Sequence, residues 1–248
     1  MQTLTIRLDK LLSNNGYISR RGVKSFLKNE TVTVNGKRVR ESGTRIDTKK
    51  DEVKINGKKV KESVNVYYLL NKPKGIISTS SDEFDRENVT DLVPTDTRIY
   101  PVGRLDKDTH GLILLTNDGE LTNKLTHPSS HVSKIYLLEI KGRVSDGKIE
   151  KLKNGIILTD GITNKANVKR IKETETKTIL QMEIFEGRYR QIRRMCEAIF
   201  LDLIDLKRIQ LGPIKIEGLK EGKYRVLTKD EIKDLYASFS QNERGNMA

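Results

Sequence analysis

The alternation of apolar and polar residues in the first quarter of the chain predicts two short helices and two hairpins. Leucines recur at the spacing of one helix face, so a helix is expected over residues 7–15. Ser19 is suited to cap a second helix that reaches about residue 28. The segments 31–39 and 53–60 each alternate around an Asn-Gly pair, which is typical of a β-hairpin. We expect both hairpins to share one small sheet.

The rest of the chain mixes strand and helix patterns without regular alternation of the two. Short apolar runs bounded by turn residues predict strands over 66–70, 112–115, 135–140, 176–185, 204–209 and 224–227. Helices are expected over 120–126, after Ser145, around Met195, and after the capping box Thr228-Lys229-Asp230-Glu231. This mixture predicts an α+β fold whose central sheet is mixed and mainly antiparallel.

A polar stretch near residues 61–65 marks a boundary between two domains. We expect a small αβ domain at 1–63, a larger α+β domain at 64–240 and a polar tail at 241–248.

Charge is divided unevenly between these domains. The chain has 248 residues and a formal charge of +13, and its first 63 residues contain 16 Lys and Arg against 7 Asp and Glu. This balance favours polyanionic partners, above all nucleic acid. The apolar runs are too short to span a bilayer, so no membrane partner is expected. The single cysteine, Cys196, cannot form an internal disulfide, which is typical of a reducing, cytoplasmic location.

Basic side chains gather in two places in the first domain. One face of the second helix and the residues after the first Asn-Gly turn carry Arg20, Arg21, Lys24, Lys28, Lys37, Arg38 and Arg40. Both groups could contact the phosphates of a structured RNA. A solvated face is the plain alternative, but the number and concentration of these charges favour RNA binding.

One stretch of the second domain carries candidate chemistry. In GRLDKDTHG at 103–111, a carboxylate lies between basic residues and glycines, directly before a run that predicts a buried strand. Alone, this window fits a catalytic loop and an ordinary turn equally well. Asp106 and Asp108 also suggest a magnesium site, although Arg104 and Lys107 already supply positive charge there. The chain has no zinc-type cysteine and histidine spacing and no glycine-rich phosphate loop.

These motifs resemble those of a known family. Residues 6–60, with two short helices before VTVNGKRV, resemble the S4 RNA-binding domain. The stretch VGRLDKDTHGLILLTNDGEL resembles the signature around the essential aspartate of RNA pseudouridine synthases of the RsuA and RluB type. LNKPKG at 70–75, KIYLLEI at 134–140 and EGRYRQIRRM at 186–195 occur in the same order as in that family, and the resemblance covers about residues 6–235.

The resemblance implies roles for single residues. Asp106 matches the essential aspartate, Tyr136 the active-site tyrosine and Arg193 the basic residue that pairs with the aspartate. Arg104 matches the position proposed to fill the space left by the extruded uridine. Lys72 belongs to the first motif, which supports the active-site sheet. The expected substrate contacts are Arg104, Lys72, Arg188 and Arg190 in the second domain and Arg20, Arg21, Lys24, Lys37 and Arg38 in the first.

The resemblance also implies the chemistry. Isomerisation of uridine breaks the N1 glycosidic bond and forms a C5 glycosidic bond without redox change, so neither cofactor nor metal is expected. A carboxylate near C1′ either adds to the sugar or takes the C2′ proton, and both routes stay open.

The expected partner is ribosomal RNA, free or in an assembly intermediate, and the expected state is a monomer. GRYRQIRRMCE and LNKPKGIIST are closer to the branch that acts on large-subunit, 23S rRNA. Two alternatives stay open: a 16S rRNA pseudouridine synthase of the same family, and a noncatalytic S4 RNA-binding assembly factor.

Relatives are expected to carry a glycine-containing turn after Ala198, whereas this chain has Ile199-Phe200-Leu201-Asp202. The difference concerns the end of the helix and not the chemistry.

Overall fold

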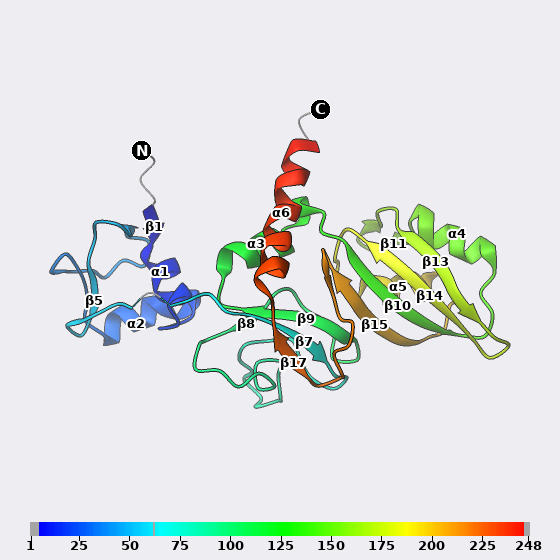
Figure 1. Cartoon of the computed structure of the whole chain (residues 1–248), viewed down its shortest axis with the longest axis horizontal. Coiled ribbons are helices and arrows are strands. Elements are labelled where there is room, and N and C mark those ends of the chain that lie inside the picture. Colours follow the sequence, from blue (N-terminus) through cyan, green and yellow to red (C-terminus); the bar gives the residue numbers. More distant parts are fainter. Residues whose placement is uncertain (1–4, 62, 246–248) are drawn as a thin grey trace. The chain divides into compact units, whose positions relative to one another are not determined.

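The chain folds into two compact units. The computed structural model describes residues 5–61 and 63–245 (Figure 1). The first unit contains the chain up to Val66 together with Thr95–Ile99 and Asn117–Gly119, and the second contains the remainder. The first unit is therefore not one continuous stretch.

The first unit has the αβ composition that the pattern predicts. Its elements are β1 (Thr5–Arg7), α1 (Leu8–Asn14), the 3₁₀ helix η1 (Arg20–Gly22), α2 (Val23–Asn29), β2 (Val32–Val34), β3 (Lys37–Arg38), β4 (Arg45–Asp47), β5 (Val53–Ile55) and β6 (Lys58–Lys59). A four-stranded sheet has the order β3-β2-β5-β6, and β1 pairs with β4. Leu8, Leu12, Val23, Leu27 and Val32 are buried in the core between helices and sheet. Both helices and the single sheet of two hairpins are confirmed.

Both hairpins turn at the Asn-Gly pairs. φ is +51° at Asn35 and +49° at Asn56, and the glycine that follows each also has positive φ. Two successive positive values are the requirement of a type I′ turn, whose twist matches that of paired strands. The side-chain oxygen of Asn35 accepts the Glu52 N–H at 2.9 Å, and that of Asn56 accepts the Thr31 N–H at 2.9 Å. Each turn is thus tied to the other hairpin.

The second unit is built on one large sheet. Its elements are β7 (Tyr67–Lys72), β8 (Tyr100–Pro101), β9 (His110–Thr116), α3 (Gly119–Thr126), the 3₁₀ helix η2 (Pro128–Ser130), β10 (Lys134–Lys141), α4 (Asp146–Asn154), β11 (Ile157–Leu158), β12 (Gly161–Ile162), β13 (Asn167–Glu173), β14 (Lys177–Ile184), α5 (Gln191–Ala198), β15 (Leu203–Leu211), β16 (Ile214–Lys215), β17 (Tyr224–Val226) and α6 (Lys229–Gly245). The main path of the sheet is β13-β14-β10-β15-β9-β7-β17. Among the strand pairs of the described residues, only β9 and β15 run parallel. The predicted mixed, mainly antiparallel sheet is confirmed.

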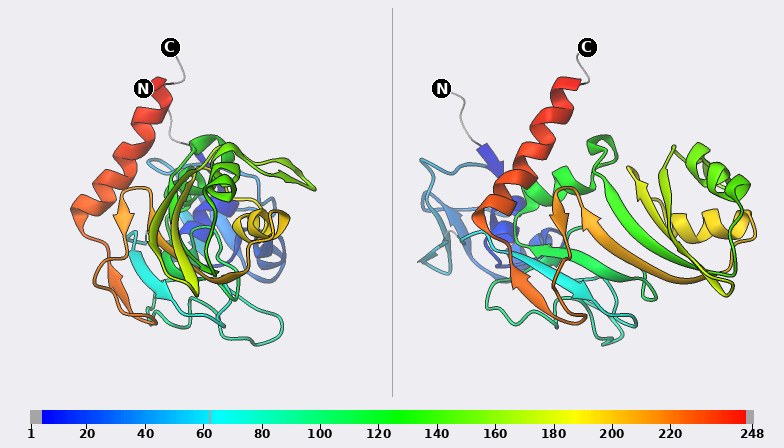
Figure 2. Two further views of the ribbon diagram at one scale, coloured as in Figure 1. Left: turned by 90° about the vertical axis from the view of Figure 1, so that its right-hand side faces the viewer. Right: turned by 45° about the vertical axis from the view of Figure 1, so that its right-hand side comes forward.

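Helices cover both faces of this sheet. α3 and α6 share one apolar core with β7, β9 and β15, in which Leu112, Leu121 and Leu235 are buried. α4 packs on β13 and α5 on β15, and α5 and α6 lie on opposite sides of the sheet (Figure 2, left). Cys196 of α5 is buried, and burial raises the pKa of its thiol to about 12, which fits its expected role in packing. No helix among the described residues is long and apolar enough to cross a bilayer.

The final helix begins with the predicted capping box. The Glu231 N–H donates to the Thr228 hydroxyl at 3.1 Å, and the Thr228 N–H donates to the Glu231 carboxylate at 2.8 Å. α6 continues to Gly245, into the stretch predicted as a polar tail. The sequence pattern did not indicate β13, because only Val168 of this edge strand is buried and no apolar alternation results.

At the end of α5, Phe200 occupies the position after Ala198 where a glycine was expected. The Leu201 N–H donates to the Cys196 carbonyl at 2.9 Å and the Phe200 N–H to the Glu197 carbonyl at 3.0 Å, which is the Schellman pattern. The residue that needs a left-handed conformation is Phe200, with φ of +57° and a side chain that is 90% exposed. A glycine is usual at this position because it has no Cβ.

We predict that Phe200→Gly stabilises the second unit by about 0.5–1 kcal/mol, because relief of the left-handed strain exceeds the entropy that glycine adds to the unfolded chain. Urea unfolding measures the change. Phe200→Ala is the control, since alanine keeps the Cβ and is expected to give no gain. Equal stabilisation by both variants would contradict the argument from backbone strain.

Candidate active site

A cleft of about 380 Å³ opens on the large sheet of the second unit. Its walls come from the loop before β9, from β10 and β15, and from the segment that leads into α5. The structure brings Asp106, Tyr136 and Arg193 together in this cleft, and Arg104, Arg188 and Arg190 line it as well.

Asp106 lies in a tight turn before β9. The Thr109 N–H donates to the Asp106 carbonyl at 3.1 Å and closes this turn. The Asp106 side chain is 29% exposed, and its carboxylate accepts no hydrogen bond from any described residue. Its oxygen lone pairs are therefore available to a substrate.

Two guanidinium groups face this carboxylate. Arg190 Nη1 is 3.7 Å from Asp106 Oδ2, and Arg193 Nε is 3.8 Å from the same oxygen. These distances exceed a hydrogen bond but leave a strong Coulomb attraction in a partly buried site. The resemblance implied Arg193 as the partner of Asp106, and Arg190 is a second one.

Asp108, to which the family resemblance gave no role, anchors both arginines. Its carboxylate lies 3.3 Å from Arg190 Nη1 and 3.2 Å from Arg193 Nη1. Burial pushes the pKa of Asp108 up, but the hydrogen bond from Arg190 and the charges of Arg193 and Arg190 outweigh it and hold the pKa below its ordinary value. Asp108 thus takes up the close contacts and leaves Asp106 free.

Arg193 also binds the loop itself. Its Nη2 donates to the Asp108 carbonyl and to the Thr109 hydroxyl, both at 3.0 Å. Its Nε is buried without a hydrogen-bond partner among the described residues, beside Asp106. A buried donor next to an uncommitted carboxylate is a suitable place for a polar atom of a substrate.

Tyr136 projects from β10 into the same space. Its side chain is 8% exposed, and it pairs across the sheet with Met182 of β14 and Arg208 of β15. Directly opposed residues lie on one face of a sheet, so these three side chains share the cleft side. Tyr136 is therefore both a packed residue and part of the cleft.

Lys72 lies beneath the loop that precedes β9, residues 103–109. Its side chain is fully buried, and its ammonium donates to the carbonyls of Thr109, Pro73 and Lys107 at 2.8, 3.0 and 3.4 Å. Burial lowers the pKa of Lys72 to about 8, against the opposing charges of Asp108 and Asp106. We expected Lys72 to contact substrate, whereas the structure gives it a supporting position under the loop.

Ser78 fixes the peptide next to Asp106. Its hydroxyl donates to the Leu105 carbonyl at 2.8 Å and accepts the Leu105 N–H at 3.1 Å. The Gly75 N–H donates to the Lys107 carbonyl at 2.8 Å, so residues 75–78 run beside the loop. The sequence did not identify Ser78, because a serine in an extended segment gives no sign of its partner.

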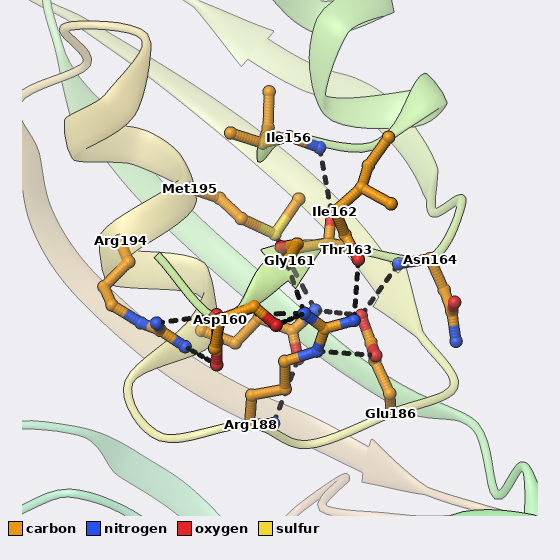
Figure 3. Close-up of polar contacts among 11 residues, drawn as sticks. Ile156, Asp160, Gly161, Ile162, Thr163, Asn164, Glu186, Arg188, Arg194 and Met195 are labelled. Atoms are coloured by element: carbon orange, nitrogen blue, oxygen red, sulfur yellow. Dashed lines mark hydrogen bonds and ion pairs between the residues drawn. The ribbon is translucent and has the colours of Figure 1, made fainter. Parts of the chain in front are cut away.

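Arg188 ties the segment before α5 to the β11–β12 hairpin (Figure 3). Its guanidinium donates to the carbonyls of residues 160–162 at 2.7–3.3 Å and to Glu186 at 3.1 Å. Arg194 holds the Asp160 carboxylate through both Nη atoms at 3.0 Å. The donors of Arg188 are thus engaged within the protein, although the sequence predicted a substrate contact.

Arg104 is exposed at the cleft and has no ion pair with a described residue.

His110 connects the loop to the sheet beyond it. Its Nε2 is 2.9 Å from Asp205 Oδ2, its Nδ1 is 3.3 Å from Glu221 Oε2, and Lys74 Nζ is 2.6 Å from Asp205 Oδ1. His110 at the start of β9 and Asp205 of β15 thus hold the end of the loop in place.

The described residues contain no group of three or more His, Cys, Asp or Glu side chains placed to hold a metal ion.

Two further cations line the cleft, Lys134 of β10 and Arg208 of β15. Burial, followed by the charge of Arg208, lowers the pKa of Lys134 to about 8. The sequence pattern predicted both strands, but neither residue had an expected role. The available signal was an arginine at an inward position of a strand, where an apolar residue normally lies.

The first unit has a basic groove of about 590 Å³. Lys24, Lys28, Arg38 and Arg40 line it. Arg20 lies instead 3.6 Å from Asp9, and Arg21 and Lys37 are exposed outside the groove. The structure therefore brings together Lys24 and Arg38 of the predicted contacts.

Comparison with known proteins agrees with these features. Residues 66–198 match the model of the family described as RNA pseudouridylate synthase, and residues 6–53 match the S4 domain. The chain is 44% identical over 234 residues to ribosomal large subunit pseudouridine synthase B of Bacillus subtilis (strain 168), with 93% of this chain and 96% of that protein covered.

Two other matches span most of the chain. The dual-specificity RNA pseudouridine synthase RluF of Salmonella typhi is 36% identical, with 93% of this chain and 78% of that protein covered. A solved structure, described as a crystal structure of pseudouridylate synthase, is 29% identical with a TM-score of 0.67, and covers 93% of this chain and 99% of its own. With its S4 domain and its cleft around Asp106, this chain belongs to the RNA pseudouridylate synthase family.

Proposed function

We propose that this protein converts a uridine of large-subunit ribosomal RNA into pseudouridine. The observation that carries the proposal is the Asp106 carboxylate, which faces two guanidinium groups in the cleft and accepts no hydrogen bond from the described residues. Large-subunit rRNA is favoured over 16S rRNA because the B. subtilis relative, which matches along nearly its whole length, is named for the large subunit.

The cleft suits a base extruded from its stack. A volume of about 380 Å³ is in the range of sites for small organic groups. Tyr136 offers an aromatic plane to the base and a hydroxyl to its edge. Arg104, exposed and without an ion pair among the described residues, is free to enter the space that the base leaves.

Asp106 supplies the chemistry. When the base excludes water, Asp106 either bonds to C1′ as the N1 bond breaks or removes the C2′ proton. Arg193 and Arg190 compensate the buried carboxylate, and Asp108 keeps both of them in place. The backbone around Asp106 is held by Lys72 and Ser78, which matters because errors of about 1 Å in position slow catalysis strongly.

We assign RNA binding to residues 1–63 and the isomerisation reaction to residues 64–240. The basic groove with Lys24 and Arg38 supports phosphate contacts by the first segment. The protein acts as a monomer in the cytoplasm in this proposal. The noncatalytic alternative needs no uncommitted carboxylate in a cleft, so the site favours the enzyme.

Deletion of the gene tests the target. We expect one pseudouridine to disappear from large-subunit rRNA when modified positions are mapped in the deletion strain. Loss from 16S rRNA would support the other branch, and an unchanged map would contradict the function.

Asp106→Asn tests the reaction. RNA binding is expected to change less than about twofold, because the phosphate contacts remain, while tritium release from [5-³H]uridine rRNA is lost. Unimpaired release would contradict the assignment of Asp106. Full activity in excess EDTA, on a substrate that folds without magnesium, would exclude the two-aspartate metal site.

Lys72→Met separates support of the loop from contact with substrate. We expect kcat to fall by about 10- to 100-fold with little change in KM, because the carbonyls under the loop lose their donor. A rise in KM at unchanged kcat would instead indicate a substrate contact. Tritium release over a range of rRNA concentrations gives both constants.

The same variant has a pH signature. The pKa of Lys72 is about 8 in the folded protein and ordinarily 10.5, so the unfolded chain binds more protons between these pH values. The stability of the wild-type protein should therefore rise relative to Lys72→Met from pH 8 to 10.5. Denaturant unfolding across this range measures the difference, and a flat difference would contradict the burial of a charged ammonium.

Ser78→Ala removes both hydrogen bonds to Leu105. We expect kcat to fall by about 10-fold or more with RNA affinity unchanged, and Ser78→Thr to restore most of the loss. Thr79→Ala is the matched control, because the Thr79 hydroxyl bonds to Ser81 within its own segment. Equal effects of the two alanine variants would show that contact with the catalytic loop is not the cause.

A further inference from the structure

Arg208 has a buried donor without a partner among the described residues. Its side chain is 3% exposed, and its Nε donates to the Leu112 carbonyl at 2.7 Å. Its Nη2 is buried and makes no hydrogen bond in the described structure. A buried guanidinium with an unsatisfied donor and no ionic partner is energetically costly, so we expect a ligand to accept a hydrogen bond from this donor.

The backbone of Arg208 holds this group at the bottom of the cleft. Arg208 opposes Tyr136 across β10 and β15, and both line the cleft. On its other side it pairs with Gly111, at the end of the catalytic loop. A Cβ at Gly111 would lie 2.2 Å from the Arg208 carbonyl oxygen, and φ there is +102°, so only glycine allows this approach.

The surroundings of Arg208 favour an anion. None of the ion pairs among the described residues includes Arg208, and Lys134 is a second cation close to it. Besides Asp106, the acid that lines the cleft is Glu186, whose carboxylate already accepts from Arg188 at 3.1 Å and from Gln191 at 2.7 Å. Among the described residues, the cleft floor thus presents positive charge with no carboxylate paired to Arg208.

We propose that Arg208 binds the carbonyl edge of the extruded uracil and stabilises the uracil anion that forms when the N1–C1′ bond breaks. This rests on the proposed isomerisation. As the bond breaks, its electron pair passes to the base and is shared over N1, O2 and O4. C1′ is compensated by a bond to Asp106 or by loss of the C2′ proton.

The anion is then consumed within the cleft. C5 forms the new bond to C1′ while the bond from C1′ to Asp106 breaks or, on the glycal route, Asp106 returns the proton to C2′. The C5 proton then leaves and N1 is protonated. No atom is gained or lost, so the product is an isomer. A hydrogen-bond donor that stabilises charge formed only during the reaction raises the rate of conversion but does not strengthen RNA binding.

A backbone phosphate is the other anion that a guanidinium binds. Phosphates belong to the strand from which the base is extruded, whereas Arg208 lines the cleft and is almost fully buried. The extruded base is the part of the nucleotide that penetrates deepest. The structure therefore favours the base over the phosphate as the ligand of Arg208. Loss of a base contact should lower the rate, whereas loss of a phosphate contact should raise the Kd for RNA.

The test uses single-turnover conversion of a stem-loop transcript that contains the uridine mapped by gene deletion. We expect Arg208→Met to slow conversion at saturating RNA by about 100-fold, in the range seen when one donor to a developing anion is removed, with Kd for the RNA unchanged. Arg208→Lys, which keeps a cation, should lose less. Nuclease digestion and chromatography of the target nucleoside measure conversion.

A second transcript carries 5-fluorouridine at the target. Fluorine withdraws electrons and stabilises the base anion, so Arg208→Met should slow this substrate only about 10-fold. Because C5 then carries fluorine and has no proton to lose, loss of the 5-fluorouridine nucleoside after digestion is measured in place of pseudouridine formation. An equal loss on both transcripts would overturn the proposal, and so would a raised Kd with an unchanged rate, which indicates a phosphate contact.

Control variants distinguish a local role of Arg208 from a general effect of charge or of misfolding. Arg143→Met removes a positive charge outside the cleft of the same unit and should leave the rate near that of the wild-type protein. Circular dichroism and thermal unfolding report whether the Arg208 variants fold, and Arg208→Lys and Arg208→Gln take the place of Arg208→Met if it does not. Wild-type protein that converts no rRNA uridine would refute the proposed function itself, whereas an active wild type with a fully active Arg208→Met would refute only the role of Arg208.

Discussion

The site depends on the attraction between two carboxylates and two guanidinium groups that come from segments more than 80 residues apart. Asp108 takes the short contacts with Arg190 and Arg193, and Asp106 receives only the longer ones. One acid thus secures the cations and the other keeps its lone pairs. The same number of charges in a fully hydrogen-bonded arrangement would be better satisfied and chemically idle.

Most of the precision of the loop comes from its backbone. Lys72 fixes carbonyls from below and Ser78 fixes the peptide that precedes Asp106. On the opposite wall, Arg188 fixes the segment before α5 through three carbonyls of a hairpin. Side chains that hold main-chain atoms in this way leave the side chain of Asp106 uncommitted.

Local signals predicted the local structure. The Asn-Gly turns, the Thr228 capping box and the run after Gly111 depend on neighbours in the sequence, and all three were found. The motif resemblance also identified the residues that meet in the cleft, with Asp106 first among them. The burial of Lys72 and the inward arginine at 208 could not be predicted in this way. Their surroundings come from strands that meet only through sheet register, such as β15 beside β9.

The position of β15 in the sheet has a consequence for the order of folding. β15 lies between β10 and β9, so it joins a set made of β7, β8 and β9 to a set made of β10, β13 and β14. Until residues 203–211 leave the ribosome, each set keeps an unpaired inner edge, and such edges invite wrong pairing. The long separation between β9 and β15 makes their pairing a late and slow step. The nascent chain therefore carries every residue of the Asp106 cluster before it has a cleft, and the cleft is completed only when this one strand closes the sheet.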